Sequence, residues 1–193
     1  MSQCPPKTES VQITLNKSEV QQIIKLAAQR YSENRKAGNP EIKMSKAPEG
    51  STAHEVVGLA GEMAVLKYLG FPEQTHTYSY KQKDFTLIKA DIYDVGELEV
   101  RSTHYNSGCL VFQTKDLRKN PDLPYILCTI AKPCPQGRIV VTLRGWSTPK
   151  RGCTPDRVRT VYTTSWYVEQ KHLSSLNTLP AFYFYNPESL VSA

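Results

Sequence analysis

The sequence has no long hydrophobic run, and this absence excludes one class of protein. No stretch of the 193 residues approaches the roughly 20 consecutive apolar residues that a membrane-spanning helix needs. The opening segment, MSQCPPKTES, also lacks the apolar core of a secretory signal. We therefore expect no contact with a membrane and a cytoplasmic location, which for a viral protein is the cytoplasm of the host cell.

Cysteine and histidine are few and irregularly spaced, which argues against a zinc site or a disulfide framework. None of the five cysteines forms a Cys-x-x-Cys pair, and the four histidines fit no zinc motif. The chain also lacks a glycine-rich phosphate loop and a Gly-x-Ser-x-Gly elbow. These absences favour reduced thiols and argue against nucleotide-binding and serine-hydrolase sites of the usual kinds.

The composition is that of one ordinary globular domain with a mild basic excess. Hydrophobic residues make up 39% and charged residues 22% of the chain, and the net charge is +6. A basic excess of this size is compatible with a polyanionic partner such as nucleic acid, although many proteins carry it. We expect a flexible tail over residues 1–11 and a single domain over residues 12–193.

The hydrophobic periodicity changes along the chain from helical to strand-like. The segment VQITL predicts a short strand, and residues 18–38 predict a helix capped by Asn16 or Ser18. A second helix is expected over residues 53–70, ending at Gly70. Strands are then expected in five segments, at residues 84–88, 96–103, 109–114, 125–130 and 138–146. A short helix is expected around 168–176. This order predicts an α/β domain with N-terminal helices packed on a mixed central β-sheet.

The stretch DVGELEVRS concentrates charge on a half-buried strand. Because side chains alternate along a strand, Glu99 and Arg101 share one face, and a turn at Gly96 can bring Asp94 back beside Glu99. Two adjacent carboxylates repel each other unless a positive group lies between them. A hard cation such as Mg²⁺ meets that need, whereas a salt-bridged surface strand is the simpler alternative.

Glu62 borders the apolar stripe of the second helix. Burial of a carboxylate is unfavourable unless it is paired or binds a metal. Glu62 is therefore a candidate to point at the same site as Asp94 and Glu99. The alternative is that it reaches the surface or pairs with Lys67.

The ordered motifs GEMAVLKYLG, DVGELEVRS, LVFQTKD, LPYILCTI and LRGW resemble those of small phage and bacterial proteins, and more widely the PD-(D/E)xK nuclease superfamily. The resemblance covers about residues 50–170 and implies a restriction-endonuclease-like core. In that superfamily a helix glutamate, an aspartate and a Glu-x-Lys strand surround a divalent metal. It thus implies Glu62, Asp94 and Glu99 as ligands of Mg²⁺ or Mn²⁺, with Asp91 as the rival first acid.

Arg101 departs from the superfamily pattern, which has lysine at this position. Arginine stays protonated and cannot act as a general base, but it can clamp a phosphate and stabilise developing negative charge. Lys115 and Gln113, on the next predicted strand, are candidates to supply an ammonium group and to position water. In LRGW, Gly145 is expected to permit a turn or the close packing of Trp146.

The resulting hypothesis is a metal-dependent nuclease that hydrolyses phosphodiester bonds, with DNA as the expected substrate. One alternative is a catalytically inactive protein of the same fold that binds nucleic acid or a host protein. Another is an interaction protein that docks through its aromatic C-terminal region, AFYFY, although such a segment more often belongs to the core or to an edge strand. The oligomeric state stays open, and a homodimer is one arrangement compatible with the sequence.

Overall fold

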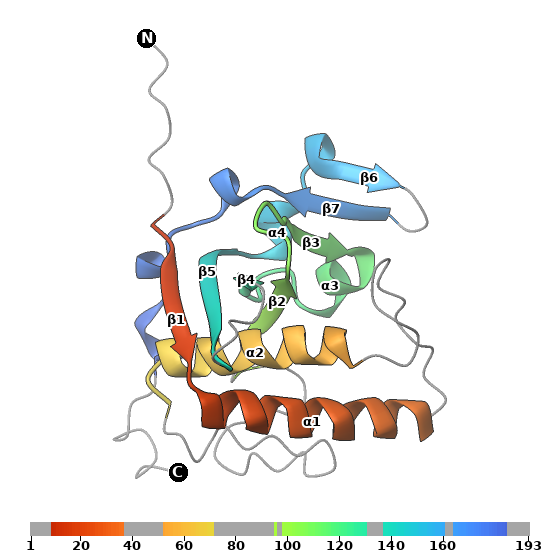
Figure 1. Ribbon diagram of the computed structural model, residues 1–193. Helices are drawn as coiled ribbons and strands as arrows, with labels where there is room; N and C mark the ends of the chain where they lie inside the picture. Colours follow the sequence, from red (N-terminus) through yellow and green to blue (C-terminus); the bar gives the residue numbers. More distant parts are fainter. Residues whose placement is uncertain are drawn as a thin grey trace, which may run out of the picture.

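Helices and strands are mixed along the chain in an α/β arrangement (Figure 1). A computed structural model describes residues 9–36, 52–71, 95, 98–130, 137–160 and 164–184. The strands are β1 (Val11–Leu15), β2 (Glu99–Thr103), β3 (Leu110–Gln113), β4 (Tyr125–Ile130), β5 (Ile139–Ser147), β6 (Val158–Thr160) and β7 (Thr164–Val168). The helices are α1 (Lys17–Lys36), α2 (Ala53–Tyr68), α3 (Thr114–Lys119) and α4 (Pro149–Gly152). Short 3-10 turns follow at Pro155–Arg157, Gln170–His172, Leu176–Thr178 and Ala181–Tyr183.

The strands form two sheets. The larger one has the order β1-β5-β4-β2, in which β2 and β4 run parallel and the other pairs run antiparallel. Parallel neighbours need a crossover connection, and β3 with α3 lies between β2 and β4 in the chain. The smaller sheet is antiparallel with the order β3-β7-β6.

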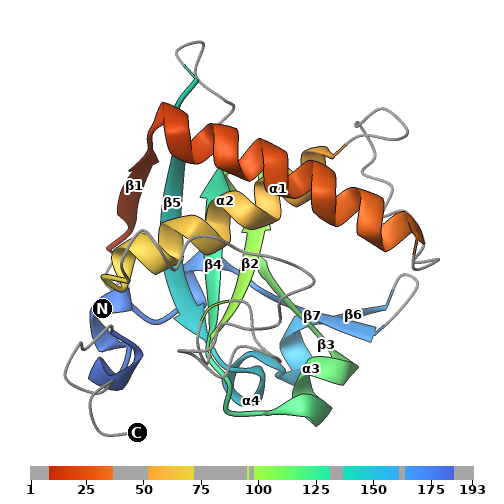
Figure 2. The ribbon, with the colours of Figure 1, turned by 90° about the horizontal axis from the view of Figure 1, so that it is seen from below.

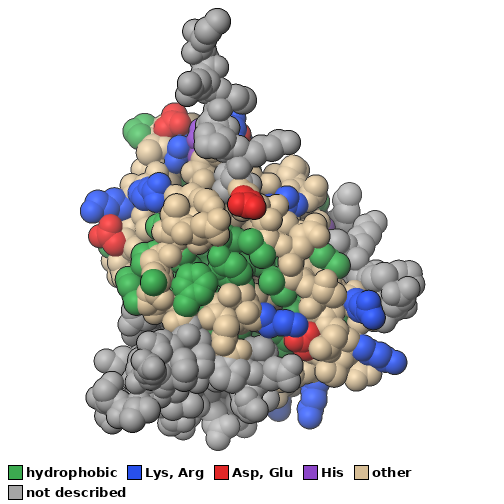
Figure 3. Space-filling view, turned by 90° about the vertical axis from the view of Figure 1, so that its left-hand side faces the viewer, with side chains coloured by type: hydrophobic (Ala, Val, Ile, Leu, Met, Phe, Trp, Pro, Cys, Tyr) green, Lys and Arg blue, Asp and Glu red, His purple; other side chains and the backbone are tan. Residues whose placement is uncertain are grey.

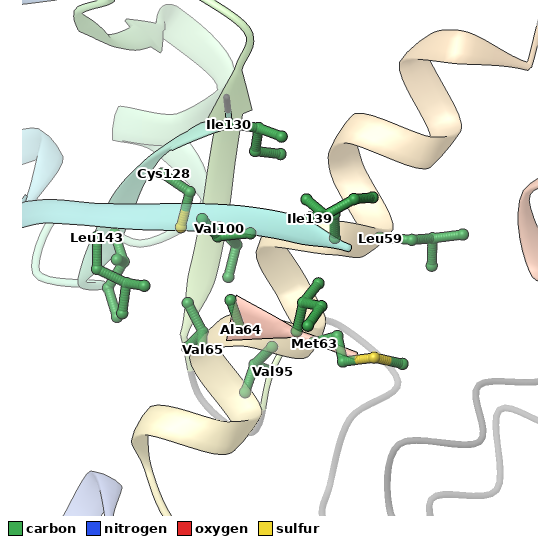
Figure 4. Close-up of a cluster of buried hydrophobic side chains, with 14 of the residues drawn as sticks. Leu59, Met63, Ala64, Val65, Val95, Val100, Cys128, Ile130, Ile139 and Leu143 are labelled. Atoms are coloured by element: carbon green, nitrogen blue, oxygen red, sulfur yellow. The ribbon is translucent and has the colours of Figure 1, made fainter. Parts of the chain in front are cut away.

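The main core lies between the larger sheet and α2 (Figure 4). Ala64 and Val65 of α2 point toward the strands, near Val100, whereas Leu59 and Met63 of the same cluster point away from them. Gly61 brings the helix very close to β2, because a Cβ atom there would lie 1.9 Å from Ser102 Oγ. Helix α1 packs on α2 and forms an outer layer (Figure 2).

A second core lies on the opposite face of β4. Its side chains belong to β3, β4, β7 and the turns around them: Leu110, Phe112, Leu123, Tyr125, Leu127, Val168 and Leu173. Every residue of β4 is buried because the strand has a core on both faces. No helix of the described ranges is long and apolar enough to cross a bilayer.

Most predicted elements appear close to their expected positions. Helices α1 and α2 match residues 18–38 and 53–70, and Asn16 rather than Ser18 caps α1, because its side chain accepts a hydrogen bond from Glu19 N at 3.0 Å. The strand predicted at 84–88 lies outside the described residues. The helix expected around 168–176 is absent, since β7 ends at Val168 and 3-10 turns follow.

Gly145 occupies an irregularity between β4 and β5. Leu127 pairs with Gly145 and Cys128 pairs with Leu143, so Arg144 is an extra residue that forms a bulge. The φ angle of Gly145 is 137°, which glycine adopts readily and other residues rarely do. Beyond the bulge, Trp146 is nearly buried and its Nε1 donates to Ser175 O at 3.0 Å. Gly145 thus allows the irregular backbone of the bulge that leads into Trp146, and its role in the close packing of Trp146 stays a prediction.

The aromatic C-terminal segment is only partly buried. Ala181–Tyr183 forms a 3-10 turn rather than an edge strand, and Phe182 is 72% exposed. Tyr183 and Phe184 pack against the main core, where Phe184 contacts the ring of Tyr68. Hydrophobic side chains gather on the side of the molecule that lies to the left in Figure 1 (Figure 3).

Candidate functional site

The two faces of β2 point into different layers of the molecule. Because β2 pairs in parallel with β4, Val100 lies beside Ile126 and Arg101 beside Leu127. Val100 and Ile126 belong to the core under α2, whereas Leu127 belongs to the second core. Side chains alternate across a strand, so Glu99 and Arg101 face the side of α3 and the smaller sheet.

Four charged side chains meet on that side. Lys119 Nζ donates to Glu99 Oε1 at 2.8 Å, and Arg101 donates to Glu99 Oε2 at 3.3 Å. Arg101 also donates to Asp116 Oδ1, at 3.4 Å. We call these four residues, Glu99, Arg101, Asp116 and Lys119, the β2–α3 charge cluster.

Within the β2–α3 charge cluster, the acidic side chains are buried and the basic side chains are partly exposed. Glu99 and Asp116 are 7% and 4% exposed. The side chains of Arg101 and Lys119 are instead 36% and 38% exposed. The two carboxylates are therefore buried beneath two cations that solvent can reach.

Asp116 was not among the predicted site residues. It is the third residue of α3, and its Oδ2 accepts a hydrogen bond from Gln113 N at 2.8 Å while the Gln113 side chain caps the helix in return. This reciprocal arrangement is a capping box, for which Gln113 and Asp116 have the required spacing in the sequence. The spacing could have indicated the helix, but not that the other carboxylate oxygen of Asp116 reaches Arg101.

Tyr125 borders the β2–α3 charge cluster from β4. Its side chain is fully buried, and its hydroxyl makes no hydrogen bond within the part of the chain that the structure describes. Burial, followed by the nearby charges of Asp116 and Glu99, raises the pKa of Tyr125 well above its usual value. The Arg101 guanidinium lies 5.0 Å from the centre of the ring. The buried hydroxyl therefore lies beside two carboxylates and an arginine.

The thiol of Cys153 lies near the negative charge of Asp116. Burial and the neighbouring Asp116 raise the pKa of the Cys153 thiol to about 11. Because the nucleophilic form of cysteine is the thiolate, Cys153 is a poor nucleophile near neutral pH. We therefore look to the charged side chains, and not to Cys153, for the reactive groups on this side of the molecule.

Glu62 does not join the β2–α3 charge cluster, so its expected convergence with Glu99 is wrong. Its neighbour Gly61 packs on Val100 and Ser102, which lie on the α2 face of β2, and Glu62 Oε1 accepts from Arg30 of α1 at 3.1 Å. The larger sheet therefore separates the two glutamates. The alternative pairing of Glu62 with Lys67 is also wrong, because Lys67 binds Glu19 at 2.8 Å.

Gln113 and Lys115 do not share a strand face as predicted. Strand β3 ends at Gln113, and Lys115 lies in α3 as an exposed residue. The chain turns there because the capping box starts a helix. The lysine that reaches Glu99 is Lys119, one helical turn further on.

The metal ligands predicted from the sequence are only partly placed. Asp91 and Asp94 lie outside the described residues, and within those residues no three His, Cys, Asp or Glu side chains gather to hold a metal ion. Glu99 and Asp116 still offer hard oxygen donors, and Mg²⁺ commonly binds through one or two carboxylates with waters and a substrate phosphate. The donor type therefore fits Mg²⁺ or Mn²⁺, with Arg101 and Lys119 as the groups that compete for the same oxygens.

Comparisons with known proteins returned no match. No protein-family model, curated protein or solved structure is significantly similar to this chain. The resemblance to the PD-(D/E)xK nucleases therefore stays a prediction from the motifs.

Proposed function

We propose that this chain is a metal-dependent nuclease with a restriction-endonuclease-like core that hydrolyses phosphodiester bonds, with DNA as its substrate. The observation that supports this proposal best is the bridge that Arg101 makes between the buried carboxylates of Glu99 and Asp116. In this proposal Asp116 takes the place first assigned to Glu62. Asp94 or Asp91 completes the acidic set.

Glu99 and Asp116 are the described residues that would hold the divalent ion. When bound, such an ion polarises the phosphate and lowers the pKa of a bound water, so that hydroxide is available near neutral pH. Ion binding requires that the carboxylate oxygens exchange some of their contacts with Arg101 and Lys119.

Arg101 and Lys119 are the groups that an approaching phosphate meets first. Both are partly exposed, while the carboxylates lie beneath them. A guanidinium can donate two parallel hydrogen bonds to a phosphate and stays charged throughout the reaction. Arg101 would therefore orient the substrate and neutralise charge on the phosphoryl group, and Lys119 would contribute a second positive charge.

Binding of nucleic acid without cleavage is the second candidate function. Two observations favour it: Glu99 is already neutralised by two cations, and Glu62 lies across the sheet from it. Arginine in place of the usual lysine agrees with a site that has lost catalysis. The same fold could also bind a host protein.

The deciding experiment compares two glutamates that are both buried and both paired with arginine. Wild-type protein, Glu99→Gln and Glu62→Gln are incubated with single-stranded DNA, duplex DNA and RNA, in Mg²⁺, Mn²⁺ or EDTA. We expect cleavage by the wild type that requires metal, and a loss of about 100-fold or more in Glu99→Gln because a ligand and a charge are removed. Glu62→Gln should stay within about threefold of the wild type.

The other outcomes separate the candidates. Equal loss in both variants would mean that the rate reflects folding and not the β2–α3 charge cluster. Tight binding with no cleavage under any metal supports the binding protein. The absence of both cleavage and binding contradicts both candidates and favours a protein partner.

A further inference from the structure

The positive charge of the chain is concentrated around α3 and α4. Residues 110–123 and 147–172 contain eight of the 24 Lys and Arg residues but only four of the 18 Asp and Glu residues. One of those four acids is Asp116, which is buried. This region therefore accounts for +4 of the net charge of +6.

Helices α3 and α4 lie side by side (Figure 2). Lys115 and Arg118 are exposed on α3, and Lys150 and Arg151 are exposed on α4. Lys150 N donates to Pro121 O at 2.8 Å, just beyond the end of α3, which joins the two segments directly. The two segments that carry these cations are thus adjacent in space.

Several of these side chains are held in place. The Arg151 guanidinium lies 5.4 Å from the centre of the Trp146 ring. Arg157 Nη1 donates to Arg151 O at 3.2 Å, which ties the following turn to α4. Lys150 pairs with the exposed Asp122 at 3.3 Å, so its charge is partly offset. A guanidinium that rests on an aromatic ring loses less side-chain freedom when it binds a phosphate.

This surface is continuous with the β2–α3 charge cluster. Lys119 ends α3 and donates to Glu99, while Lys115 and Arg118 point from the same short helix to solvent. A strand of nucleic acid whose phosphate lies at Arg101 would therefore pass along α3 and α4. Phosphate contacts of this kind position a nucleic acid without reading its sequence.

We propose that the surface formed by Lys115, Arg118, Lys119, Lys150, Arg151 and Arg157 binds the sugar–phosphate backbone of the nucleic acid on which the β2–α3 charge cluster acts. The inference rests on the proposed function for its substrate class and adds the path of the strand. It assigns binding to α3 and α4 and gives α1 no part in it, although α1 also carries exposed cations such as Lys25 and Arg35.

The test compares the removal of one lysine and one arginine from α3 with the same removal from α1. Lys115→Gln/Arg118→Gln is compared with Lys25→Gln/Arg35→Gln, which has the same charge change on α1. Binding of fluorescently labelled single-stranded DNA, duplex DNA and RNA is measured by anisotropy in EDTA, between about 50 and about 200 mM salt. EDTA prevents cleavage, so binding is measured separately from catalysis.

We expect the α3 variant to bind about tenfold more weakly near 0.1 M salt, with a salt dependence of log K that is shallower by about 1.8 for duplex DNA. The α1 variant should bind within about twofold of the wild type. Melting temperatures measured for both variants confirm that they are folded. Equal weakening in the two variants overturns the inference, as does the absence of binding by the wild type.

Failure of this inference differs from failure of the proposed function. If cleavage requires metal and the α3 variant binds as well as the wild type, the proposed binding surface is wrong and the proposed nuclease function stands. Selective weakening of the α3 variant in a protein that never cleaves supports the surface and removes the nuclease.

Discussion

Two buried glutamates that pair with arginine, Glu62 and Glu99, lie on opposite sides of the larger sheet, and their surroundings differ. On the α2 side, Glu62 joins two helices through Arg30. On the other side, Glu99 pairs with Lys119 and shares Arg101 with a second buried acid, Asp116, beside the buried side chain of Tyr125. One ion pair with Arg30 is enough to compensate for the burial of Glu62, so this pair can be explained by stability alone. Two buried acids that share one partly exposed arginine are harder to explain as packing, and this difference directs the search for function to the α3 side.

The largest effect on stability is expected on the α2 side, at Gly61→Ala. The added Cβ would lie 1.9 Å from Ser102 Oγ, so helix and strand must separate. We expect the free energy of unfolding to fall by about 2 kcal/mol, even after the gain in helix propensity of about 1 kcal/mol. Denaturant titration measures this change.

Gly58→Ala is the matched control in the same helix. Its Cβ would meet nothing closer than Glu62 Oε1 at 3.9 Å, so stability should stay the same or rise by up to about 1 kcal/mol. Ser102→Ala combined with Gly61→Ala should recover part of the loss. Equal effects of Gly58→Ala and Gly61→Ala would contradict the close packing.

An effect of similar size is expected for Asp116→Asn, which we compare with Glu62→Gln. Asp116 both caps α3 and pairs with Arg101, so we expect a loss of about 2 kcal/mol in the free energy of unfolding. Glu62→Gln removes one ion pair between helices and should lose about 1 kcal/mol. Urea titrations of both variants measure the difference. If Glu62→Gln lowers the free energy of unfolding more than Asp116→Asn does, then the pair of Glu62 with Arg30 contributes more to stability than the contacts of Asp116, contrary to this expectation.

A smaller effect of opposite sign is expected at Tyr125→Phe. Because the hydroxyl is buried without a hydrogen bond in the described part of the chain, its removal should raise the free energy of unfolding by about 0.5 kcal/mol. The same variant should cleave nucleic acid more slowly if the hydroxyl contacts substrate. A clear loss of stability would instead mean that the hydroxyl has a partner in the folded protein.

The smallest effect concerns the rate of alkylation of Cys153. With a pKa of about 11, only about one thiol in a thousand is ionised at pH 8, so alkylation should be slow and should rise about tenfold per pH unit up to pH 10. Asp116→Asn removes a negative neighbour, lowers this pKa and should speed alkylation several-fold. Mass spectrometry of the Cys153 peptide measures the rate, and Glu62→Gln should leave it unchanged.

The helices and most strands could be predicted from the sequence because their signals are local. The apolar spacing of α1 and α2, the cap at Asn16 and the run from Tyr125 to Ile130 each depend on neighbours in the chain. The alternation of β2 also indicated correctly that Glu99 and Arg101 share a face.

The composition of the candidate site could not be predicted in the same way. A helical wheel places Glu62 at the edge of the apolar stripe but does not show which face of the sheet the helix covers. The capping box at Gln113 ended β3 earlier than its hydrophobic pattern indicates, and this moved Lys115 away and brought in Asp116 and Lys119. Such contacts depend on the connection between β2 and β4, which the periodicity of a single segment does not contain.

The position of β1 at the edge of the larger sheet has a consequence for how the protein is made. Among the described strands, β1 pairs with β5 alone, and Val11 lies opposite Leu143. During synthesis β1 therefore has no partner until the residues of β5 have left the ribosome. Closing so large a loop is entropically unfavourable and slows folding. Nascent chains that stop before Leu143 should consequently depend most on chaperones.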